Sequence, residues 1–233
     1  MTRSLDLSTY LVADVATITG SGYRRSVADV VAAAVAGGSR VVQVRGKDLA
    51  ANELLQVVEA CAARVDGRAL LLVNDRVDVA LAARLRGVAV DGVHVGQSDL
   101  PVDRVRALLG GDAIVGLSAS RGDEVVALRA LPAGTVDYLG VGAVRATPTK
   151  RDHATPLSWE GFAAFRGTVP DLPCVAIGGV GTGDAAEALR AGASGLAVVR
   201  AVCSAPDPEA AAMALRAEWD AALTIRQRSG AAA

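Results

Sequence analysis

The sequence predicts a single α/β domain folded as a closed (β/α)8 TIM barrel, and three observations lead to that fold class. Short runs rich in Val, Ile and Leu alternate eight times with longer segments that carry apolar residues at helical spacing. The short runs are apolar almost throughout, which is typical of parallel strands buried on both faces. A chain of 233 residues has room for eight such strand-helix units. An open doubly wound sheet is the alternative, but no Gly-x-Gly-x-x-Gly follows the first run.

The expected elements alternate along the whole chain. Apolar runs bounded by Gly, Asp, Asn or Pro predict strands at 9–13, 41–44, 70–73, 92–95, 114–117, 138–141, 174–177 and 195–198. Helical spacing between these runs predicts helices at 27–36, 51–65, 76–84, 102–109, 123–129, 159–165, 184–191 and 208–226. Thr182 or Asp184 is a suitable N-cap for the seventh helix, and Gly192 follows its end. Residues 1–226 are therefore expected to form one domain, and 227–233 a loose tail.

Composition narrows the class of partner. Hydrophobic residues make up 52% of the chain, and 24 Lys and Arg oppose 25 Asp and Glu, which leaves a formal charge of −1. Such a balance offers no basic field for nucleic acid or for an acidic membrane surface. The chain has three cysteines without a Cys-x-x-Cys pair, and it lacks a signal-like start or an apolar stretch of about 18 residues. We expect a soluble cytoplasmic protein that acts on small molecules; a homo-oligomer is one option for its assembly.

Chemistry-bearing residues follow the predicted strands. In a (β/α)8 barrel the carboxyl ends of all strands meet at one mouth, where the functional loops lie. The residues at these positions are Gln43, Val44, Arg45, Gly46, Lys47, Asn74, Asp75, His94, Asp99, Ser118, Thr147, Pro148, Thr149, Lys150, Gly178, Gly179, Val199 and Arg200. Only Lys47 and Lys150 are lysines, whereas the other 22 cations are arginines. A compact point charge at a crowded site is one reason to keep a lysine.

Two carboxylates are spaced for a metal ion. Asp75 and Asp99 are 24 residues apart, which is one strand-helix unit, so they are expected at the tops of neighbouring strands. Two carboxylates with waters and a phosphate make a normal magnesium site. Arg45, Lys47 and Lys150 at the same mouth would bind a polyanion such as diphosphate. The alternatives are that each aspartate caps a following helix and that the cations are solvated loop charges.

The last two strands predict a monophosphate site. Gly178 and Gly179 follow the seventh strand, and Val199 and Arg200 follow the eighth, where main-chain N–H groups commonly bind phosphate in barrel enzymes. A tight turn is the alternative explanation of the glycine pair. His94 lies in an alternating Gly-Val-His-Val-Gly run, which favours a hydrogen-bonded core histidine over a catalytic base, so it is given no role.

Six segments together resemble the thiamine phosphate synthase family over about residues 10–202. They are Val42-Gln43-Val44-Arg45-Gly46-Lys47, Val73-Asn74-Asp75-Arg76, Gly92-Val93-His94-Val95-Gly96-Gln97-Ser98-Asp99-Leu100, Gly116-Leu117-Ser118, Thr147-Pro148-Thr149-Lys150 and Ala176-Ile177-Gly178-Gly179-Val180. The resemblance implies a transferase on a (β/α)8 barrel. It joins a hydroxymethylpyrimidine diphosphate to a thiazole phosphate, releases diphosphate and gives thiamine phosphate, with Mg²⁺ assisting.

The resemblance also implies site roles. Residues 43–47, Asn74, Ser118 and Lys150 would hold the pyrimidine diphosphate, with Arg45, Lys47, Ser118 and Lys150 as the catalytic set. Asp75 and Asp99 would hold the metal. Thr147, Pro148, Thr149, Gly179, Val199 and Arg200 would hold the thiazole phosphate. The chemistry agrees, because the protein then needs to neutralise a departing anion and align two substrates, without a nucleophile or a strong base.

The chain departs from the family pattern at a few positions. Gly46 replaces a common acidic residue, Arg200 replaces a small serine, and the segment 84–90 is longer than usual. Two other functions stay open. One is a thiazole tautomerase-like isomerase, although such relatives place a histidine at the position of Ala143 and lack the 147–150 run. The other is a noncatalytic phosphate-binding barrel, which would need neither the carboxylate pair nor the full set of cations.

Overall fold

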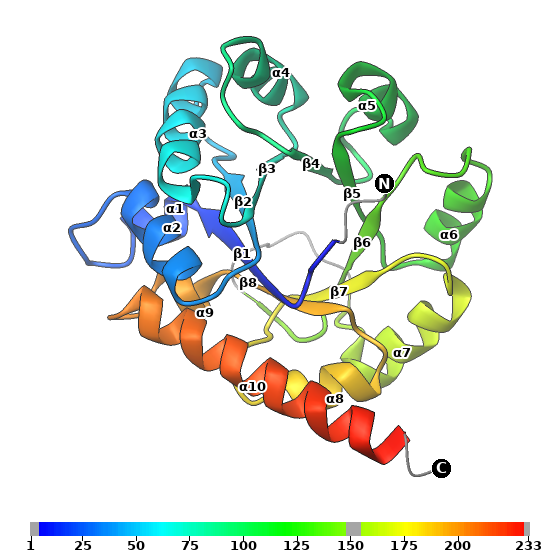
Figure 1. Cartoon of the computed structure of the whole chain (residues 1–233). Helices are drawn as coiled ribbons and strands as arrows, with labels where there is room; N and C mark the ends of the chain where they lie inside the picture. Colours follow the sequence, from blue (N-terminus) through cyan, green and yellow to red (C-terminus); the bar gives the residue numbers. More distant parts are fainter. Residues whose placement is uncertain (1–4, 148–154, 231–233) are drawn as a thin grey trace.

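The computed structural model describes residues 5–147 and 155–230, and the chain forms a closed parallel barrel (Figure 1). Its strands lie in chain order from β1 to β8, and β8 pairs with β1 to close the ring. Every neighbouring pair is parallel, as in the register of Asn74 with His94 between β3 and β4. The predicted fold class is confirmed.

The strands are close to their predicted positions. They are β1 (Thr9–Asp14), β2 (Val41–Arg45), β3 (Leu70–Asn74), β4 (Gly92–Val95), β5 (Ile114–Ser118), β6 (Tyr138–Val141), β7 (Cys174–Ile177) and β8 (Gly195–Val198). Each observed difference is one extra residue at a carboxyl end. That residue is polar in all four cases, namely Asp14, Arg45, Asn74 and Ser118.

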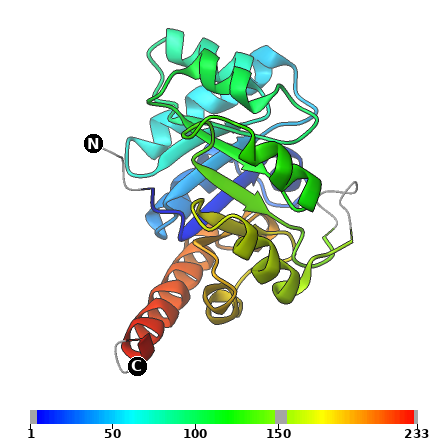
Figure 2. The same cartoon turned by 90° about the vertical axis from the view of Figure 1, so that its right-hand side faces the viewer.

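The helices surround the barrel (Figure 2). They are α1 (Val15–Thr19), α2 (Val27–Ala36), α3 (Ala51–Val65), α4 (Val77–Leu85), α5 (Val102–Leu109), α6 (Gly122–Arg129), α7 (Ser158–Thr168), α8 (Ala185–Arg190), α9 (Arg200–Cys203) and α10 (Pro208–Gly230). The short α1 and α9 were not predicted. Asp14 explains α1, because its carboxylate accepts a hydrogen bond from Thr17 N at 3.0 Å and so caps the helix.

The last helix is longer than predicted: α10 continues to Gly230 instead of ending at Arg226, so residues 227–230, expected in the tail, are helical. Gln227 and Arg228 are good helix formers, and Ser229 Oγ bonds back to Ile225 O at 3.1 Å. No helix-breaking residue precedes Gly230, so the helix has no reason to end at Arg226. Residues 231–233 lie outside the described residues.

Two apolar layers hold the barrel together. The larger layer lies between strands and helices, where α3 contributes Leu54, Val58, Cys61 and Val65 from one buried face. The smaller one fills the barrel interior and includes Leu7, Tyr10, Val12, Val41, Leu72, Ile114, Tyr138, Val175 and Ala197. Burial raises the pKa of the thiols of Cys61 and Cys203 to about 12 and of Cys174 to about 11, as expected for cysteines that serve as small apolar residues.

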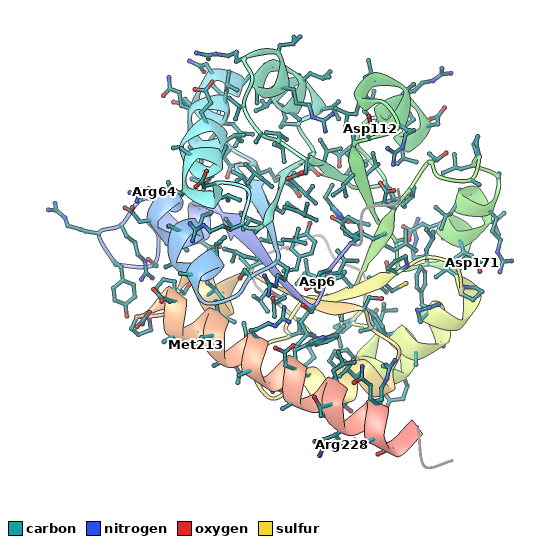
Figure 3. The ribbon with its side chains drawn as sticks, viewed as in Figure 1. Asp6, Arg64, Asp112, Asp171, Met213 and Arg228 are labelled. Atoms are coloured by element: carbon teal, nitrogen blue, oxygen red, sulfur yellow. The ribbon has the colours of Figure 1, made fainter. Side chains whose placement is uncertain are left out.

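The amino-terminal rim is separate from the mouth. Asp6, Asp112 and Asp171, labelled in Figure 3, all precede strands and mark this rim. The long segment 84–90 also precedes a strand here, and the Arg84 guanidinium holds it by donating to Val90 O at 2.8 Å and Asp91 O at 2.9 Å. Within residues 5–147 and 155–230, no helix combines the length and apolar character needed to cross a membrane.

Gly195 allows β8 to approach the chain entering β1, and its replacement tests barrel closure. A Cβ atom at Gly195 would overlap the main-chain carbonyl of Leu7 and lie 3.1 Å from Ser8 Cα. We expect Gly195→Ala to lower the free energy of unfolding by about 3 kcal/mol, measured by urea denaturation. The control is Gly167→Ala in α7, where a Cβ meets nothing within 4 Å and stability should stay equal or rise. Equal stability of the two variants would contradict this account of closure.

Candidate active site

The parallel register brings the predicted residues to one end of the barrel. Gln43 and Arg45 lie on β2, Asn74 ends β3, and Ser118 ends β5. Residues that follow strands directly are Asp75 after β3, Gly178 and Gly179 after β7, and Val199 and Arg200 after β8. Thr147 lies on the segment that leaves β6. Pro148, Thr149 and Lys150 lie outside the described residues.

Arg45 is fixed by a carboxylate from the neighbouring strand. Its Nη1 donates to Asp14 Oδ1 at 2.5 Å, and the two residues are paired in the register of β1 and β2. The Asp14 side chain is 5% exposed, so this ion pair is shielded from water on one side. Asp14 also caps α1 through Thr17. The buried Asp14 carboxylate therefore holds the Arg45 guanidinium in place at the mouth.

Asp75 and Asp99 lie together, as the 24-residue spacing predicts. Asp75 has φ 60° and donates its N–H to His94 O at 2.8 Å, whereas Asp99 Oδ2 accepts from Gly96 N at 2.7 Å. Neither carboxylate caps the helix that follows: α4 begins after Arg76 and α5 after Pro101, without a capping hydrogen bond from either side chain. The structure thus disfavours the capping alternative for both.

The two carboxylates repel each other. Burial first, then the hydrogen bond and negative charge of Asp99, raise the pKa of Asp75 to about 6, against the lowering influence of Asn74 and Arg45. A shared proton or a cation between the groups would relieve this repulsion. Within the described ranges no cluster of three or more His, Cys, Asp or Glu residues is placed to hold a metal. Any metal bound by this pair would need oxygens from water or substrate as well.

Lys47 and Gly46 differ in their surroundings. Lys47 is exposed and forms no ion pair with the described residues. Gly46 is buried, and a Cβ atom there would lie 2.9 Å from Leu54 Cδ1 and 3.0 Å from Leu49 Cδ1. Those two leucines occupy the space that an acidic side chain would need. The departure at Gly46 is therefore matched by local packing.

The loops after β6 and β7 are joined by an arginine. Gly178 and Gly179 have φ of 90° and 70°, which favours glycine. Arg145 donates to both carboxylate oxygens of Asp184 at 2.8 Å and to Gly179 O at 3.2 Å. Asp184 also accepts from Gly181 N at 2.8 Å. This bidentate pair fixes the glycine loop against the loop from β6.

Arg200 is the first residue of α9. Its side chain is exposed and forms no hydrogen bond or ion pair with the residues that the structure describes. It is therefore available to a ligand at this side of the mouth. Val199, which precedes it, accepts from Val202 N and Cys203 N through its carbonyl and anchors the short helix.

His94 is a buried, hydrogen-bonded core histidine, as its sequence context favours. Its Nδ1 lies 2.9 Å from Tyr138 Oη, and its Nε2 lies 2.9 Å from Ser118 Oγ. Gln97 Nε2 also donates to Ser118 O at 2.7 Å. Ser118 is thus held at both its hydroxyl and its carbonyl.

Several residues that form contacts in this region were not predicted from the sequence. Asp14 follows the first predicted strand and was identifiable by the same rule that found Asp75. Arg145 carries no such signal, because its partner Asp184 is 39 residues away. Tyr10 and Tyr138 read as apolar core residues, and their hydroxyl contact joins positions 128 residues apart.

Fold and site together define a class of protein: a (β/α)8 barrel with a carboxylate pair, an arginine and glycine loops at one mouth. A sequence profile described as "Thiamine monophosphate synthase" matches residues 10–202. The chain belongs to the thiamine monophosphate synthase family.

Individual relatives agree. The chain is 48% identical over 191 residues to a thiamine-phosphate synthase from Corynebacterium efficiens, covering 82% of this chain and 88% of that protein. It is 43% identical over 207 residues to a thiamine-phosphate synthase from a Roseiflexus species, covering 88% and 84%. The solved structure of a thiamine phosphate pyrophosphorylase from Pyrococcus furiosus is 29% identical, with a TM-score of 0.76 and coverage of 94% and 98%.

The raised pKa of Asp75, caused first by burial and then by Asp99, gives a prediction for the metal-free protein. With a folded-state pKa of about 6 against an ordinary 3.8, Asp75 holds a proton in the folded state that the unfolded state releases. The free energy of unfolding therefore falls as pH rises through this window, and the full cost is present above it. We expect Asp75→Asn to be more stable than the wild type by about 1 kcal/mol at about pH 7.5 and nearly equal to it at about pH 3.5.

Chemical denaturation at both pH values in EDTA measures this difference. Asp112→Asn is the matched control, because Asp112 is exposed at the opposite rim (Figure 3). A variant no more stable than the wild type at the higher pH would rule out a raised pKa of Asp75 in the folded protein.

Proposed function

We propose that this chain joins a hydroxymethylpyrimidine diphosphate to a thiazole phosphate, releasing diphosphate and forming thiamine phosphate. The observation that carries the proposal is the Asp75–Asp99 pair beside Arg45 in a chain that belongs to this family. No observation favours the tautomerase-like isomerase. Ala143 is buried, and a Cβ built on Gly178 would lie 2.5 Å from its side chain, so a histidine at 143 would need new space.

The reaction sets simple demands on the protein. The C–O bond between the pyrimidine methylene and the diphosphate breaks, and its electron pair leaves with the diphosphate. The lone pair of the thiazole nitrogen then forms the new C–N bond, and no proton needs to move. The protein must bind both substrates in line, stabilise the negative charge of the leaving diphosphate and exclude water.

The residues of the mouth suit these roles. Arg45, held by Asp14, and the exposed Lys47 would bind the diphosphate, with Lys150 assigned to the same role from the family motif. Ser118 would donate to the pyrimidine diphosphate, and Gln43, Val44, Gly46 and Asn74 would line its site. Arg45, Lys47, Ser118 and Lys150 form the proposed catalytic set.

Magnesium fits the carboxylate pair. Burial and then the neighbouring Asp99 carboxylate raise the pKa of Asp75, and carboxylate oxygens are the ligands that Mg²⁺ prefers; both points support a magnesium site here. When bound, the ion would supply positive charge to the diphosphate oxygens. Asp75 and Asp99 would hold it, and Arg45 would neutralise the remaining anionic charge.

The thiazole phosphate belongs at the other side of the mouth. Gly179, Val199 and Arg200, with Thr147, Pro148 and Thr149, are the proposed binding set. The Arg200 guanidinium is exposed and has no ion pair with the residues that the structure describes, which supports a direct contact with the phosphate in place of the hydroxyl that a serine would offer. The small charged substrates, the balanced net charge and the buried thiols support a cytoplasmic enzyme without nucleic-acid or membrane partners.

The direct test combines purified protein, hydroxymethylpyrimidine diphosphate, thiazole phosphate and Mg²⁺. Thiamine phosphate and diphosphate should appear in equal amounts, and EDTA should abolish both. Folded protein that forms neither product would overturn the proposal. In a separate binding measurement, diphosphate binding that depends on Mg²⁺ would argue against the noncatalytic barrel, which needs no carboxylate pair.

Asp99 should be essential to turnover and dispensable for folding. We expect Asp99→Ala to lower kcat/KM at least about 100-fold in the Mg²⁺-dependent assay, because it removes half of the carboxylate pair. Asp112→Ala at the opposite rim is the control and should keep wild-type activity. Near-normal turnover of a folded Asp99→Ala protein would remove this residue from the metal site.

Arg145 should affect one substrate only. Arg145→Ala releases the glycine loop from Asp184, so we expect the KM for thiazole phosphate to rise about tenfold while the KM for the pyrimidine diphosphate stays constant. Arg104→Ala is the control, since that side chain is 73% exposed and, among residues 5–147 and 155–230, forms an ion pair with Asp103 alone, at 3.5 Å. Equal changes in both KM values would indicate general loosening of the barrel instead.

A further inference from the structure

Five polar side chains form a continuous hydrogen-bonded chain through the barrel. Gln43 Nε2 lies 2.6 Å from Tyr10 Oη, which lies 2.7 Å from Tyr138 Oη. Tyr138 Oη lies 2.9 Å from His94 Nδ1, and His94 Nε2 lies 2.9 Å from Ser118 Oγ. The hydrogen-bonded network starts on β2, includes residues of β1, β6 and β4, and ends on β5, so it connects strands that are not neighbours in the barrel.

Glycines make room for this chain. A Cβ atom at Gly116 would overlap the Tyr138 ring and lie 2.5 Å from His94 Nδ1, and one at Gly140 would lie 2.9 Å from His94 Cε1. Tyr10, Gln43, His94 and Tyr138 are each at least nine-tenths buried. A polar group left unpaired at such a depth costs about 1–3 kcal/mol, so every hydroxyl here needs its partner.

The donors fix the direction of the chain. The Gln43 amide N–H donates to Tyr10 Oη, and in the Tyr10–Tyr138 contact either hydroxyl could donate. Because Gln43 Nε2 offers Tyr10 no acceptor, the buried Tyr10 proton finds a partner when it is donated to Tyr138 Oη. Burial raises the pKa of both tyrosines above the ordinary value, so they keep their protons. Tyr138 then donates to His94 Nδ1, which must be an acceptor. The histidine proton is therefore on Nε2 and is donated to Ser118 Oγ.

We propose that this network of five hydrogen-bonded side chains sets the hydrogen-bond polarity of the mouth. It holds His94 as the neutral Nε2–H tautomer, and it holds Ser118 as a donor toward substrate. Ser118 Oγ already accepts from His94, so its own proton is directed to another acceptor. The anionic oxygens of a bound pyrimidine diphosphate are such acceptors, and this part of the inference rests on the proposed function. Tyr10, Tyr138 and His94 act as positioning residues that work through Ser118 and Gln43.

Nitrogen NMR of protein labelled in its histidines tests the tautomer without any substrate. The protein has two histidines, so the spectrum of the variant His153→Gln contains signals from His94 only and assigns them. We expect a protonated Nε2 and a bare Nδ1 in the wild type at neutral pH. A protonated Nδ1, or an equal mixture, would overturn the proposal. This measurement uses the intact network of side chains, so its result does not require that a network variant such as Tyr138→Phe folds.

Tyr138→Phe tests the link to Ser118. The variant removes the donor to Nδ1, so the His94 signals should move toward a tautomer mixture, and kcat/KM for the pyrimidine diphosphate should fall about tenfold. The KM for thiazole phosphate should stay constant. Tyr23→Phe is the matched control, since Tyr23 is 43% exposed and contacts Arg25 outside the barrel.

Two results distinguish the possible failures. Normal kinetics in Tyr138→Phe together with a changed tautomer would overturn the positioning role of the chain. A wild-type protein that lacks transferase activity but shows the Nε2–H tautomer would overturn the proposed function and leave the polarity of Ser118 supported.

Discussion

The closed ring of parallel hydrogen bonds is the constraint on which the rest of the structure depends. Because β8 pairs with β1, all eight strands end on the same side, and each polar residue at a strand end is brought to one mouth. Arg45, Asn74 and Ser118 come from different strands yet belong to one site for this reason. The helices shield the outside of the ring, and the amino-terminal rim is left to residues such as Arg84 that hold loops in place.

The site is held under electrostatic and polar constraints that an apolar barrel would avoid. Asp75 and Asp99 face each other at a cost to stability, and Arg45 depends on a buried Asp14. Inside the barrel, Tyr10 and Tyr138 use hydroxyl groups where Leu or Phe would pack as well. Such groups are tolerated because each is paired. Charged groups and hydrogen-bond donors held in fixed positions near the mouth lower the free energy of unfolding. The apolar layers around the mouth compensate for this loss.

The sequence predicted the barrel well because strand periodicity is a local signal. All eight strands were placed to within one residue, and the carboxylate pair followed from its spacing of one repeat unit. The features that the sequence did not predict have separate physical causes. The end of α10 depends on the absence of a stop signal, and α1 depends on one capping carboxylate. The Arg145–Asp184 pair and the tyrosine contact join distant positions, so only the packed fold reveals them. The roles of Pro148, Thr149 and Lys150 rest on the family motif alone.

The position of α10 has a consequence for biosynthesis of the chain. This helix packs beside α2 (Figure 1). Glu209 O and Ala212 Cβ fill the space next to Gly37, and Arg216 contacts Asp6 and Ser8 near β1. Strand β1 thus receives both its second strand neighbour, β8, and a covering helix, α10, from segments that follow all the other strands in the sequence. A nascent chain still tethered to the ribosome through this segment has an open seam between β1 and the missing β8. The barrel can close only once β8 has emerged, and until then one edge of β1 is left without a strand partner.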